Sequence, residues 1–484
     1  MHLTTSINPN LFSKELEYLY TGKGLGGAFE FFYSSEPNRE EGVTDESRID
    51  KLRKDLVFMW RSRLYSDVCI GIEGSSSADH EGLAAVFSAH RFILASRSNY
   101  FHIALIEWNS QERDEDEYND HPLEPLTLML PSPPFTPPSL YFVLGFIYTG
   151  MCDFSNRKYD LDTAFHIMRS ATYISLTSLY DEIQARIVHE MMHGLFHAYV
   201  DFAEFERITG GKWCVSGCRC RQCARRIPRI IEFALLDEVK NELLQRGARR
   251  GLVEMFGKGW CNAEFAKLDK KVRDDALKGV ASRTTPLNVF PLLFAAEFAL
   301  KKLNSVSEPW ANIPRDMILV ARGRIDHVLC SQLDECFLQS EGLELLDSDG
   351  SKSEDRDQVE CIMKSIQRSV TEKSAGRLYQ VCPLLTPLTA TRLAHALEFQ
   401  ALVSSILLRP HASDPSVTML SPTSFIKQKV EDTRIELLRW MKKRWVSIRM
   451  EGGLDNLDPC ALKEISHGKT LLFKDGALLT LART

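Results

Sequence analysis

Four cysteines within ten residues are the side chains best suited to chemistry in this sequence. They are Cys214, Cys218, Cys220 and Cys223, in the stretch WCVSGCRCRQCARRIPR. Thiolates at this spacing are typical zinc ligands, and the neighbouring Arg219 and Arg221 favour the charged thiolate by lowering its pKa. The sequence therefore predicts a structural zinc site, with a redox-sensitive thiol cluster or ordinary surface cysteines as the alternatives.

The ligand set of this zinc site is open. Only Arg219 separates the first cysteine pair from the second, whereas structural zinc sites place a longer loop between their pairs. Four such close thiolates would strain the backbone around one ion. Three of them with a more distant ligand form an easier site, and the candidates for that ligand are His193, His197 and Cys261.

A second metal pattern is the stretch HEMMH, which runs from His189 to His193. In zinc proteases this spacing places two histidines on one helix face, and the glutamate, here Glu190, acts as the general base. The pattern is short and lacks a distant ligand, and histidines four positions apart on a helix also occur as an ordinary polar stripe. A zinc metalloprotease therefore remains only an alternative, and we expect no enzymatic activity.

Composition narrows the remaining functions. The chain has 484 residues, of which 44% are hydrophobic and 26% charged, as in globular proteins. The net charge of −6 gives no general attraction to nucleic acid or to an anionic membrane, and no apolar stretch reaches the length of a membrane span. Twelve irregularly spaced cysteines without a secretory signal indicate reduced thiols, so we expect the cytoplasm or the nucleus, with no nucleic-acid or membrane partner.

The elements around these residues change in type along the chain. Residues 23–48 are rich in Gly, Ser and Glu and are expected to be a linker. Apolar residues at helical spacing predict an amphipathic helix over 49–63, followed by strands in DVCIGI, AAVFSA and LTLML. Residues 201–230 are predicted to be a Cys-rich basic insert, and the stretches 231–308 and 309–484 are helical in pattern. The acidic, Ser-rich residues 346–360 predict a disordered loop.

An ordered set of residues in the middle of the chain carries a family resemblance. It comprises Asp67, Phe87, Ala89, His90, Arg91, Leu94, Ala95, Ser98, Tyr100, Phe101, Leu128, Leu130, Pro131 and Tyr148-Thr149-Gly150. Over residues 49–200 this set resembles a BTB/POZ domain of the fungal type. The resemblance implies an α+β fold, a small sheet flanked by helices, followed here by a large all-α region whose residues 231–308 take a BACK-like position.

The start of the chain repeats the end of that motif. Residues 12–22, FSKELEYLYTG, match LYFVLGFIYTG at 140–150 in five positions. Residues 1–22 therefore resemble the tail of a truncated first BTB unit, which would make the protein a double-BTB protein. The alternative is a helix that happens to end at a glycine cap.

The resemblance also implies roles for individual residues. The helix 49–63 would pair with its counterpart in a second subunit through an apolar stripe, giving a homodimer, with Asp67 and Arg91 in a charged pocket at the dimer surface or as a plain ion pair. The residues of the stripe are Leu52, Leu56, Met59 and Trp60. The core motif would be Phe87, His90, Leu94, Tyr148 and Gly150, with His90 a structural residue.

The function implied by the resemblance is that of a protein-interaction adaptor. Many BTB proteins connect a cullin-3 ubiquitin ligase to a client, and here the helical C-terminal half would hold a client that the sequence does not identify. The hydrophobic-x-Glu element of cullin-binding members has no clean match after Trp108, and Leu105–Glu107 comes too early. The alternative is a non-ubiquitin scaffold or a transcription-related regulatory protein. Structural zinc is the only cofactor expected.

Overall fold

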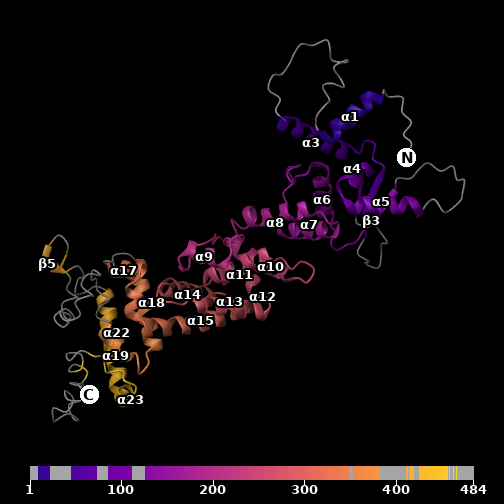
Figure 1. Ribbon diagram of the computed structural model, residues 1–484. Coiled ribbons are helices and arrows are strands. Elements are labelled where there is room, and N and C mark those ends of the chain that lie inside the picture. The colour runs from indigo at the N-terminus through magenta and orange to yellow at the C-terminus, as the bar shows by residue number, and fades with distance from the viewer. Residues whose placement is uncertain are drawn as a thin grey trace, which may run out of the picture. The chain divides into compact units, whose positions relative to one another are not determined.

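The computed structural model describes residues 9–21, 45–73, 85–111, 126–347, 353–381, 410–411, 414–418, 425–455, 457, 462 and 465 (Figure 1). The chain divides into two compact units, Met1–Met191 and Met192–Thr484, and each is described by itself. The boundary at Met191 lies nine residues before the predicted end of the first domain at 200. Most of the predicted linker, 23–44, lies outside the described residues.

Unit 1 is built on a three-stranded sheet with the strand order β2-β1-β3. Strand β1 (Val68–Ile72) is central and pairs antiparallel with β2 (Ala85–Ala89) and parallel with β3 (Leu126–Leu130). The apolar side chains of β1 alternate with its other residues, and Val68, Ile70 and Ile72 are fully buried. The three predicted strands are confirmed.

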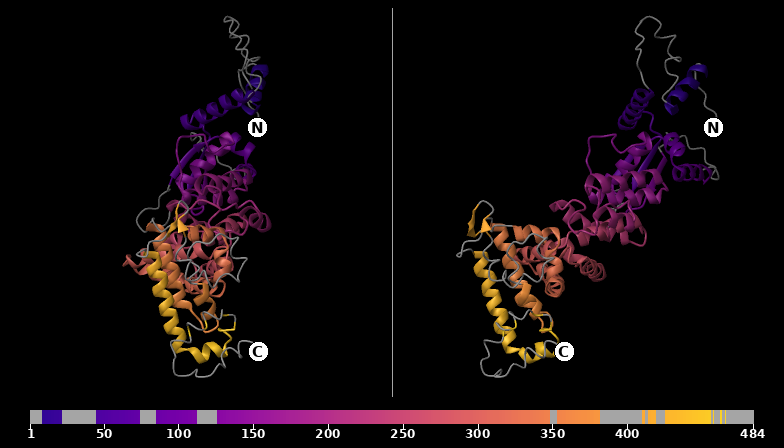
Figure 2. Two further views of the ribbon diagram at one scale, coloured as in Figure 1. Left: turned by 90° about the vertical axis from the view of Figure 1, so that its left-hand side faces the viewer. Right: turned by 60° about the vertical axis from the view of Figure 1, so that its left-hand side comes forward.

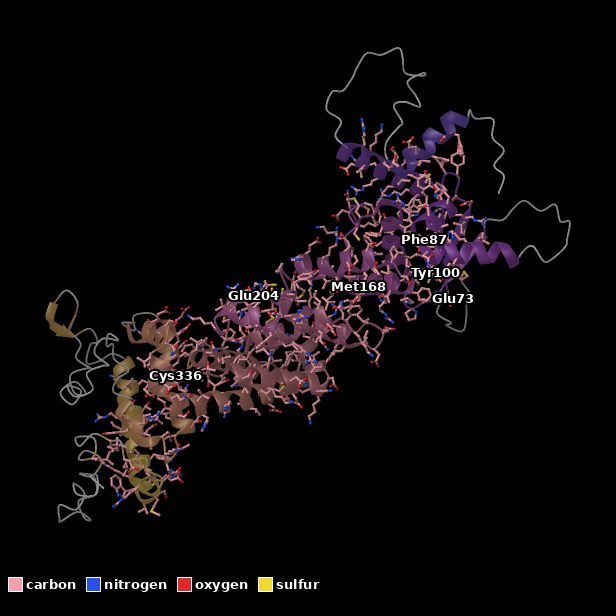
Figure 3. All side chains as sticks on the ribbon, viewed as in Figure 1. Glu73, Phe87, Tyr100, Met168, Glu204 and Cys336 are labelled. Carbon is pink, nitrogen blue, oxygen red and sulfur yellow. The ribbon has the colours of Figure 1, made fainter. Side chains whose placement is uncertain are left out.

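Helices surround this sheet in the order of the chain. They are α1 (Pro9–Thr21), α3 (Asp45–Ser62), α4 (Arg91–Arg97), α5 (Asn99–Gln111), α6 (Pro137–Thr149), α7 (Leu161–Tyr173), α8 (Thr177–Arg186) and the π-helical turn η1 (Ile187–Met191). Helix α6 is the core helix, with ten buried residues between its capping box at Thr136 and its left-handed end at Gly150. Figure 3 labels Phe87, Tyr100 and Met168 in this unit; Met168 is fully buried on α7, which packs against α6.

Unit 2 is mainly helical over its described residues. Its first helices are α9 (Phe202–Thr209), α10 (Arg221–Leu235), α11 (Glu242–Glu254), η2 (Lys258–Trp260), α12 (Ala263–Lys267), α13 (Lys270–Arg283) and α14 (Val289–Asn304). There follow η3 (Pro309–Ala311), α15 (Asn312–Ser331), α16 (Leu333–Phe337), α17 (Ser340–Asp347), α18 (Ser353–Ser369), α19 (Ala375–Val381), α22 (Phe425–Lys443) and α23 (Trp445–Met450). Helices pack as the pairs α10–α11, α14–α15 and α18–α22. In both views of Figure 2 the yellow α22 runs beside the orange helices of this unit.

Two parts of the expected helical region differ from the prediction. A small antiparallel pair, β4 (Pro410–His411) and β5 (Asp414–Thr418), interrupts it, since a proline in each strand disfavours a helix. The predicted disordered loop 346–360 is wrong outside 348–352, which the structure does not describe. Residues 353–360 begin α18, because Glu354 and Asp355 suit a helix N-terminus and Val359 starts a buried apolar stripe.

The stretch 201–230 is also corrected. It was expected to be a basic insert, but its second half is part of the core of unit 2. Cys223, Ile227 and Ile230 are buried on one face of α10, and Trp213 is buried in the loop before it. The arginines between these residues occupy the remaining positions of the helix. They make the composition of the stretch basic, which masks the amphipathic period of α10.

Candidate functional site

The buried histidine of the motif, His90, connects three separate pieces of unit 1. Its Nε2 lies 2.7 Å from the carbonyl oxygen of Leu64, and its Nδ1 lies 2.7 Å from the hydroxyl of Tyr148. A carbonyl only accepts, so we assign the ring proton to Nε2, and Nδ1 then accepts from the tyrosine hydroxyl. The backbone N–H of His90 donates to the same hydroxyl at 2.9 Å. His90 is therefore buried with both ring nitrogens in hydrogen-bond contact, an arrangement that agrees with the predicted structural role.

The other motif residues support this arrangement to different degrees. Leu94 is fully buried, and burial raises the pKa of Tyr148. Gly150 has φ +73 and ends α6, and Arg97 donates to the carbonyls of Ile147 and Tyr148 at 3.1 and 2.9 Å, near that end. Phe87 lies on β2, at the edge of the sheet, and is only half-buried, so its predicted core position is only partly confirmed.

Asp67 and Arg91 are neighbours, as predicted, but their contact is not between two charged side chains. The Asp67 carboxylate accepts the backbone N–H of Arg91 at 2.8 Å, at the first residue of α4. The N-cap position of this helix is His90, whose ring is occupied by Tyr148 and Leu64, so it makes no capping bond. Asp67 therefore takes over the capping role from a distant position in the sequence, which corrects the ion-pair prediction.

The apolar stripe of α3 is buried within the chain. Leu52 and Trp60 are 6% exposed and Leu56 is 1% exposed. The Trp60 ring stacks on Tyr148 of α6 with the ring centroids 5.6 Å apart, and Met59 is half-buried. Because α3 packs on α6 of the same chain, the expectation that this stripe is hidden only when two chains meet is wrong.

The opposite face of α3 carries an exposed ring that the sequence analysis did not single out. Phe58 is 66% exposed, and its position two residues before Trp60 turns it away from α6. Just beyond the helix, Leu64 is 50% and Tyr65 is 91% exposed. The hydrogen bond between His90 and the Leu64 carbonyl holds the segment that follows α3 in place. In this segment Tyr65 has φ +60, which is an uncommon conformation for a bulky residue. The lysines and arginines around Phe58 made this face resemble an ordinary solvated one.

An open groove runs beside the same helix. It is lined by Asp50, Arg53, Lys54, Val57, Phe58 and Arg61 from α3 and by Thr149, Met151, Asp153 and Phe154 from the segment that ends α6 and follows it. The groove presents charges of both signs beside two aromatic rings, Phe58 and Phe154. A hydrogen bond from Arg186 lowers the pKa of the Asp153 carboxyl, which keeps the acidic side of the groove charged.

In unit 2, three of the four predicted cysteine ligands lie together. The sulfur atoms of Cys218, Cys220 and Cys223 and one ring nitrogen of His193 lie within 4.8 Å of one another. The Sγ of Cys223 is 3.5 Å from the Nδ1 of His193. Among the described residues this is the one group of histidines, cysteines and carboxylates close enough to hold a metal ion. Of the three distant ligands considered, the structure brings His193 to the cysteines.

His193 begins a left-handed turn of the backbone. Positive φ angles of 39–95° run without interruption over residues 193–197, and only Gly194 among them is a glycine. The left-handed conformation costs a non-glycine residue roughly 1–2 kcal/mol. Leu195 and Phe196 are buried, and Arg250 donates to the carbonyl of His197 at 2.8 Å, so packing and hydrogen bonds hold the turn. No local preference of the sequence predicts this conformation.

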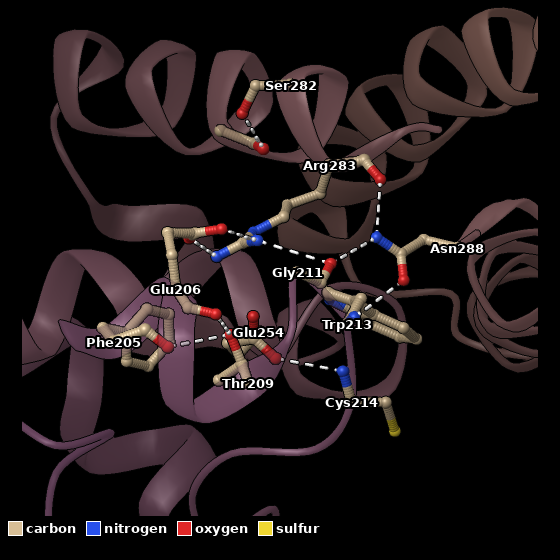
Figure 4. Close-up of polar contacts among 11 residues, drawn as sticks. Phe205, Glu206, Thr209, Gly211, Trp213, Cys214, Glu254, Ser282, Arg283 and Asn288 are labelled. Atoms are coloured by element: carbon tan, nitrogen blue, oxygen red, sulfur yellow. Dashed lines mark hydrogen bonds and ion pairs between the residues drawn. The ribbon is translucent and has the colours of Figure 1, made fainter. Parts of the chain in front are cut away.

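Cys214, the fourth predicted ligand, is separate from the other three. Its backbone N–H donates to the buried carboxylate of Glu254 at 3.0 Å, as Figure 4 shows. The guanidinium of Arg219 lies over the ring of Trp213, 4.5 Å from its centroid. Desolvation raises the pKa of Cys214 although Arg219 opposes it, so the predicted lowering of that pKa by arginine is wrong at this residue. Cys214 is therefore corrected out of the ligand set.

The HEMMH stretch does not adopt the geometry of a zinc protease. The helical segment ends at Met191 as a π-helical turn, and His193 has φ +50. His189 and His193 therefore do not share a helix face. The candidate ligand group among the described residues contains His193 without His189 or Glu190.

The part of unit 1 that would identify cullin binding is only partly described. Leu105–Glu107 lies within α5. The acidic stretch after that helix, residues 112–125, lies outside the described residues. The prediction about cullin-3 therefore stays a prediction.

Unit 1 has a small mixed sheet closed by helices, and an exposed apolar surface of the kind that serves protein interaction borders it. The family model of the BTB/POZ domain matches residues 59–191. Residues 59–191 are therefore a BTB/POZ domain, which confirms the predicted BTB/POZ family and fold and gives the chain the general function of a protein-interaction adaptor or scaffold. The fungal type and the truncated first BTB unit at residues 1–22 stay predictions. A comparison with curated proteins found no match. Within the described part of the chain, no helix combines the length and apolarity needed to span a bilayer.

Proposed function

We propose that the protein is a dimeric BTB adaptor. Its BTB domain pairs two copies through the outer face of α3 and the loop that follows, and unit 2 holds a client protein. The observation that carries this proposal is the exposure of Phe58, Leu64 and Tyr65 along one helix and its end. Exposed apolar residues gathered in one region indicate an interaction surface.

A second copy of this chain is the occupant that best fits that surface. A two-fold interface brings a surface against itself, so it requires groups that complement their own copies. The outer face of α3 meets this requirement, because the exposed Lys54 and Asp55 lie one helical turn before Phe58 and carry charges of opposite sign. Two rings can then pack at the centre of the interface while the charges pair around them.

The dimer proposal is tested by changing Phe58 in the full-length chain. Phe58→Asp places a charge where the apolar contact forms, and a central aromatic anchor contributes at least ~2 kcal/mol, so the dissociation constant rises at least ~30-fold. Sedimentation velocity across a concentration series measures this change. The matched control is Val320→Asp, at a position on α15 that is 62% exposed, which leaves the dimer intact. Equal weakening by both variants, or by neither, refutes this surface.

For the adaptor role, a cullin-3 ubiquitin ligase is the leading partner and a non-ubiquitin scaffold, including a transcription-related one, is the alternative. The BTB domain is compatible with both roles, and in either role unit 2 would hold the client. A pull-down of purified cullin-3 with the purified dimer separates them. Binding in a one-to-one ratio of chains supports the ligase adaptor. If the intact dimer retains no cullin-3, the ligase proposal fails and the scaffold remains.

A further inference from the structure

We propose that unit 2 contains a structural zinc site formed by His193, Cys218, Cys220 and Cys223. The inference goes beyond the adaptor function, because neither dimerisation nor cullin binding requires it. It also differs from the site of four cysteines in the sequence pattern, since a histidine twenty-five residues before Cys218 replaces Cys214.

The distances between the side chains fit one tetrahedral ion. With Zn–S bonds of ~2.3 Å and Zn–N bonds of ~2.0–2.1 Å, tetrahedral angles place a sulfur and a nitrogen about 3.6 Å apart and two sulfurs about 3.8 Å apart. The Cys223 Sγ to His193 Nδ1 distance is 3.5 Å, and all four ligand atoms lie within 4.8 Å of one another. An ion at their centre requires side-chain movements of less than an ångström or so.

The cysteines are held by a tight turn that suits thiolates. Cys220 is the N-cap of α10, and the backbone N–H of Cys223 donates to its sulfur at 3.4 Å. The free N–H groups and the positive end of the helix dipole favour negative charge at this position. Cys218 precedes the turn by two residues, so three sulfurs converge within six residues.

The histidine reaches the cysteines through the left-handed turn at 193–197. A run of bulky residues in this conformation is uncommon and persists where surrounding interactions determine it. Gly217 adapts to the turn, because it has φ +77 and a Cβ there would lie 2.3 Å from the ring of Phe196. The cysteine loop and the histidine turn therefore fit closely against each other, and a bound metal ion links the two segments by coordinating ligands from both.

The other candidate ligands have different roles. The backbone N–H of Cys214 donates to Glu254, and the thiol of Cys261 donates to the carbonyl of Gly257 at 3.3 Å. The ring of His197 faces that of Phe205, with the centroids 6.2 Å apart. Within the described part of the chain, none of these three residues belongs to the candidate ligand group.

The chemistry of the ligand set favours zinc. Three thiolates and one imidazole in a tetrahedral arrangement form a typical closed structural zinc site. Such a site has no open position for a substrate, so it would stabilise the start of unit 2 and would not catalyse a reaction.

The experiment measures metal in the full-length chain, purified without chelators under reducing conditions. Inductively coupled plasma mass spectrometry is expected to find about one zinc ion per chain. After dialysis against EDTA, wild-type protein keeps the metal, whereas His193→Ala, Cys218→Ser and Cys223→Ser fall below about a tenth of an ion per chain. The matched controls Cys214→Ser and Cys261→Ser keep it.

Two further measurements guard against variants that fail to fold. His193→Cys restores four thiolate ligands and is expected to regain zinc that His193→Ala has lost. Wild-type protein loaded with Co²⁺ is expected to show thiolate-to-cobalt charge-transfer bands and the visible bands of a tetrahedral ion. Wild-type protein that neither contains nor takes up zinc overturns the proposal, as does iron in its place. Loss of zinc from Cys214→Ser with retention in His193→Ala overturns this ligand set.

Discussion

Replacing Tyr148 by Phe tests whether its contact with His90 holds the BTB domain together. The substitution removes one hydroxyl and keeps the ring, so the stacking on Trp60 with centroids 5.6 Å apart is retained. The hydroxyl interacts with two groups, the Nδ1 and the backbone N–H of His90, at 2.7 and 2.9 Å. Both groups lie in the interior, where water does not replace the lost partner.

The expected loss follows from those two contacts. A buried polar group left without its partner costs ~1–3 kcal/mol. With two such groups and some relaxation of the backbone, Tyr148→Phe is expected to destabilise the domain by about 2–4 kcal/mol, a factor of roughly 30 to 1,000 in the opening equilibrium. The matched control is Tyr141→Phe, whose hydroxyl makes an exposed contact of 3.3 Å with Arg61 and contributes less than about 0.5 kcal/mol.

Amide hydrogen exchange of the full-length chain measures the effect locally, in peptides that cover β2, α4 and α6. Tyr148→Phe is expected to speed exchange in all three elements, while peptides of unit 2 remain unchanged. Combining it with His90→Leu gives less than the sum of the single losses, because both changes break the same contacts. A loss below about 1 kcal/mol for Tyr148→Phe, or additive losses in the double variant, would refute the reasoning.

Two further predictions concern unit 2. Burial raises the pKa of the Glu254 carboxyl, although the hydrogen bond from the Cys214 N–H opposes this. The folded state therefore binds this proton more tightly than the unfolded state. As a result, the stability falls as the pH rises from the pKa of the unfolded state through the pKa of the folded state. The control is Glu254→Gln, which keeps an acceptor for the Cys214 N–H. Scanning calorimetry at pH 4.5 and at pH 8 is expected to show that the melting temperature of wild-type protein falls relative to that of the variant as the pH rises. An equal difference in melting temperature at the two pH values would count against this. Gly217→Ala is expected to lower the melting temperature of unit 2, because its φ is +77 and its Cβ would meet the ring of Phe196 at 2.3 Å. Gly323→Ala on the surface of α15 has open space and should instead stabilise by up to about 1 kcal/mol, so the same sign for both variants would contradict the argument.

The BTB fold could be predicted because its signal is distributed over many positions in a fixed order. Alternation in β1, the amphipathic period of α3 and the glycine that ends α6 each follow from local preferences. The contact between His90 and Tyr148 joins residues 58 positions apart, and no spacing rule contains it. The family resemblance brought them into one motif, and the structure supplies the hydrogen bonds that explain it.

The interaction surface was less predictable, because periodicity reveals an apolar stripe without revealing what covers it. Leu52, Leu56 and Trp60 are covered by α6, whereas Phe58, on the charged face, is the exposed group. At the cysteines, spacing identified three members of the cluster. The fourth depends on a left-handed turn that begins at His193, which tertiary packing imposes against local preference.

The central claim is that the BTB domain pairs two copies of this chain, and the mass of the full-length protein in solution tests it most directly. Light scattering coupled to size-exclusion chromatography, at micromolar concentration and moderate salt, gives that mass independently of shape. The account predicts twice the chain mass of 55.1 kDa. A single species of 55.1 kDa at every concentration up to the solubility limit would contradict it.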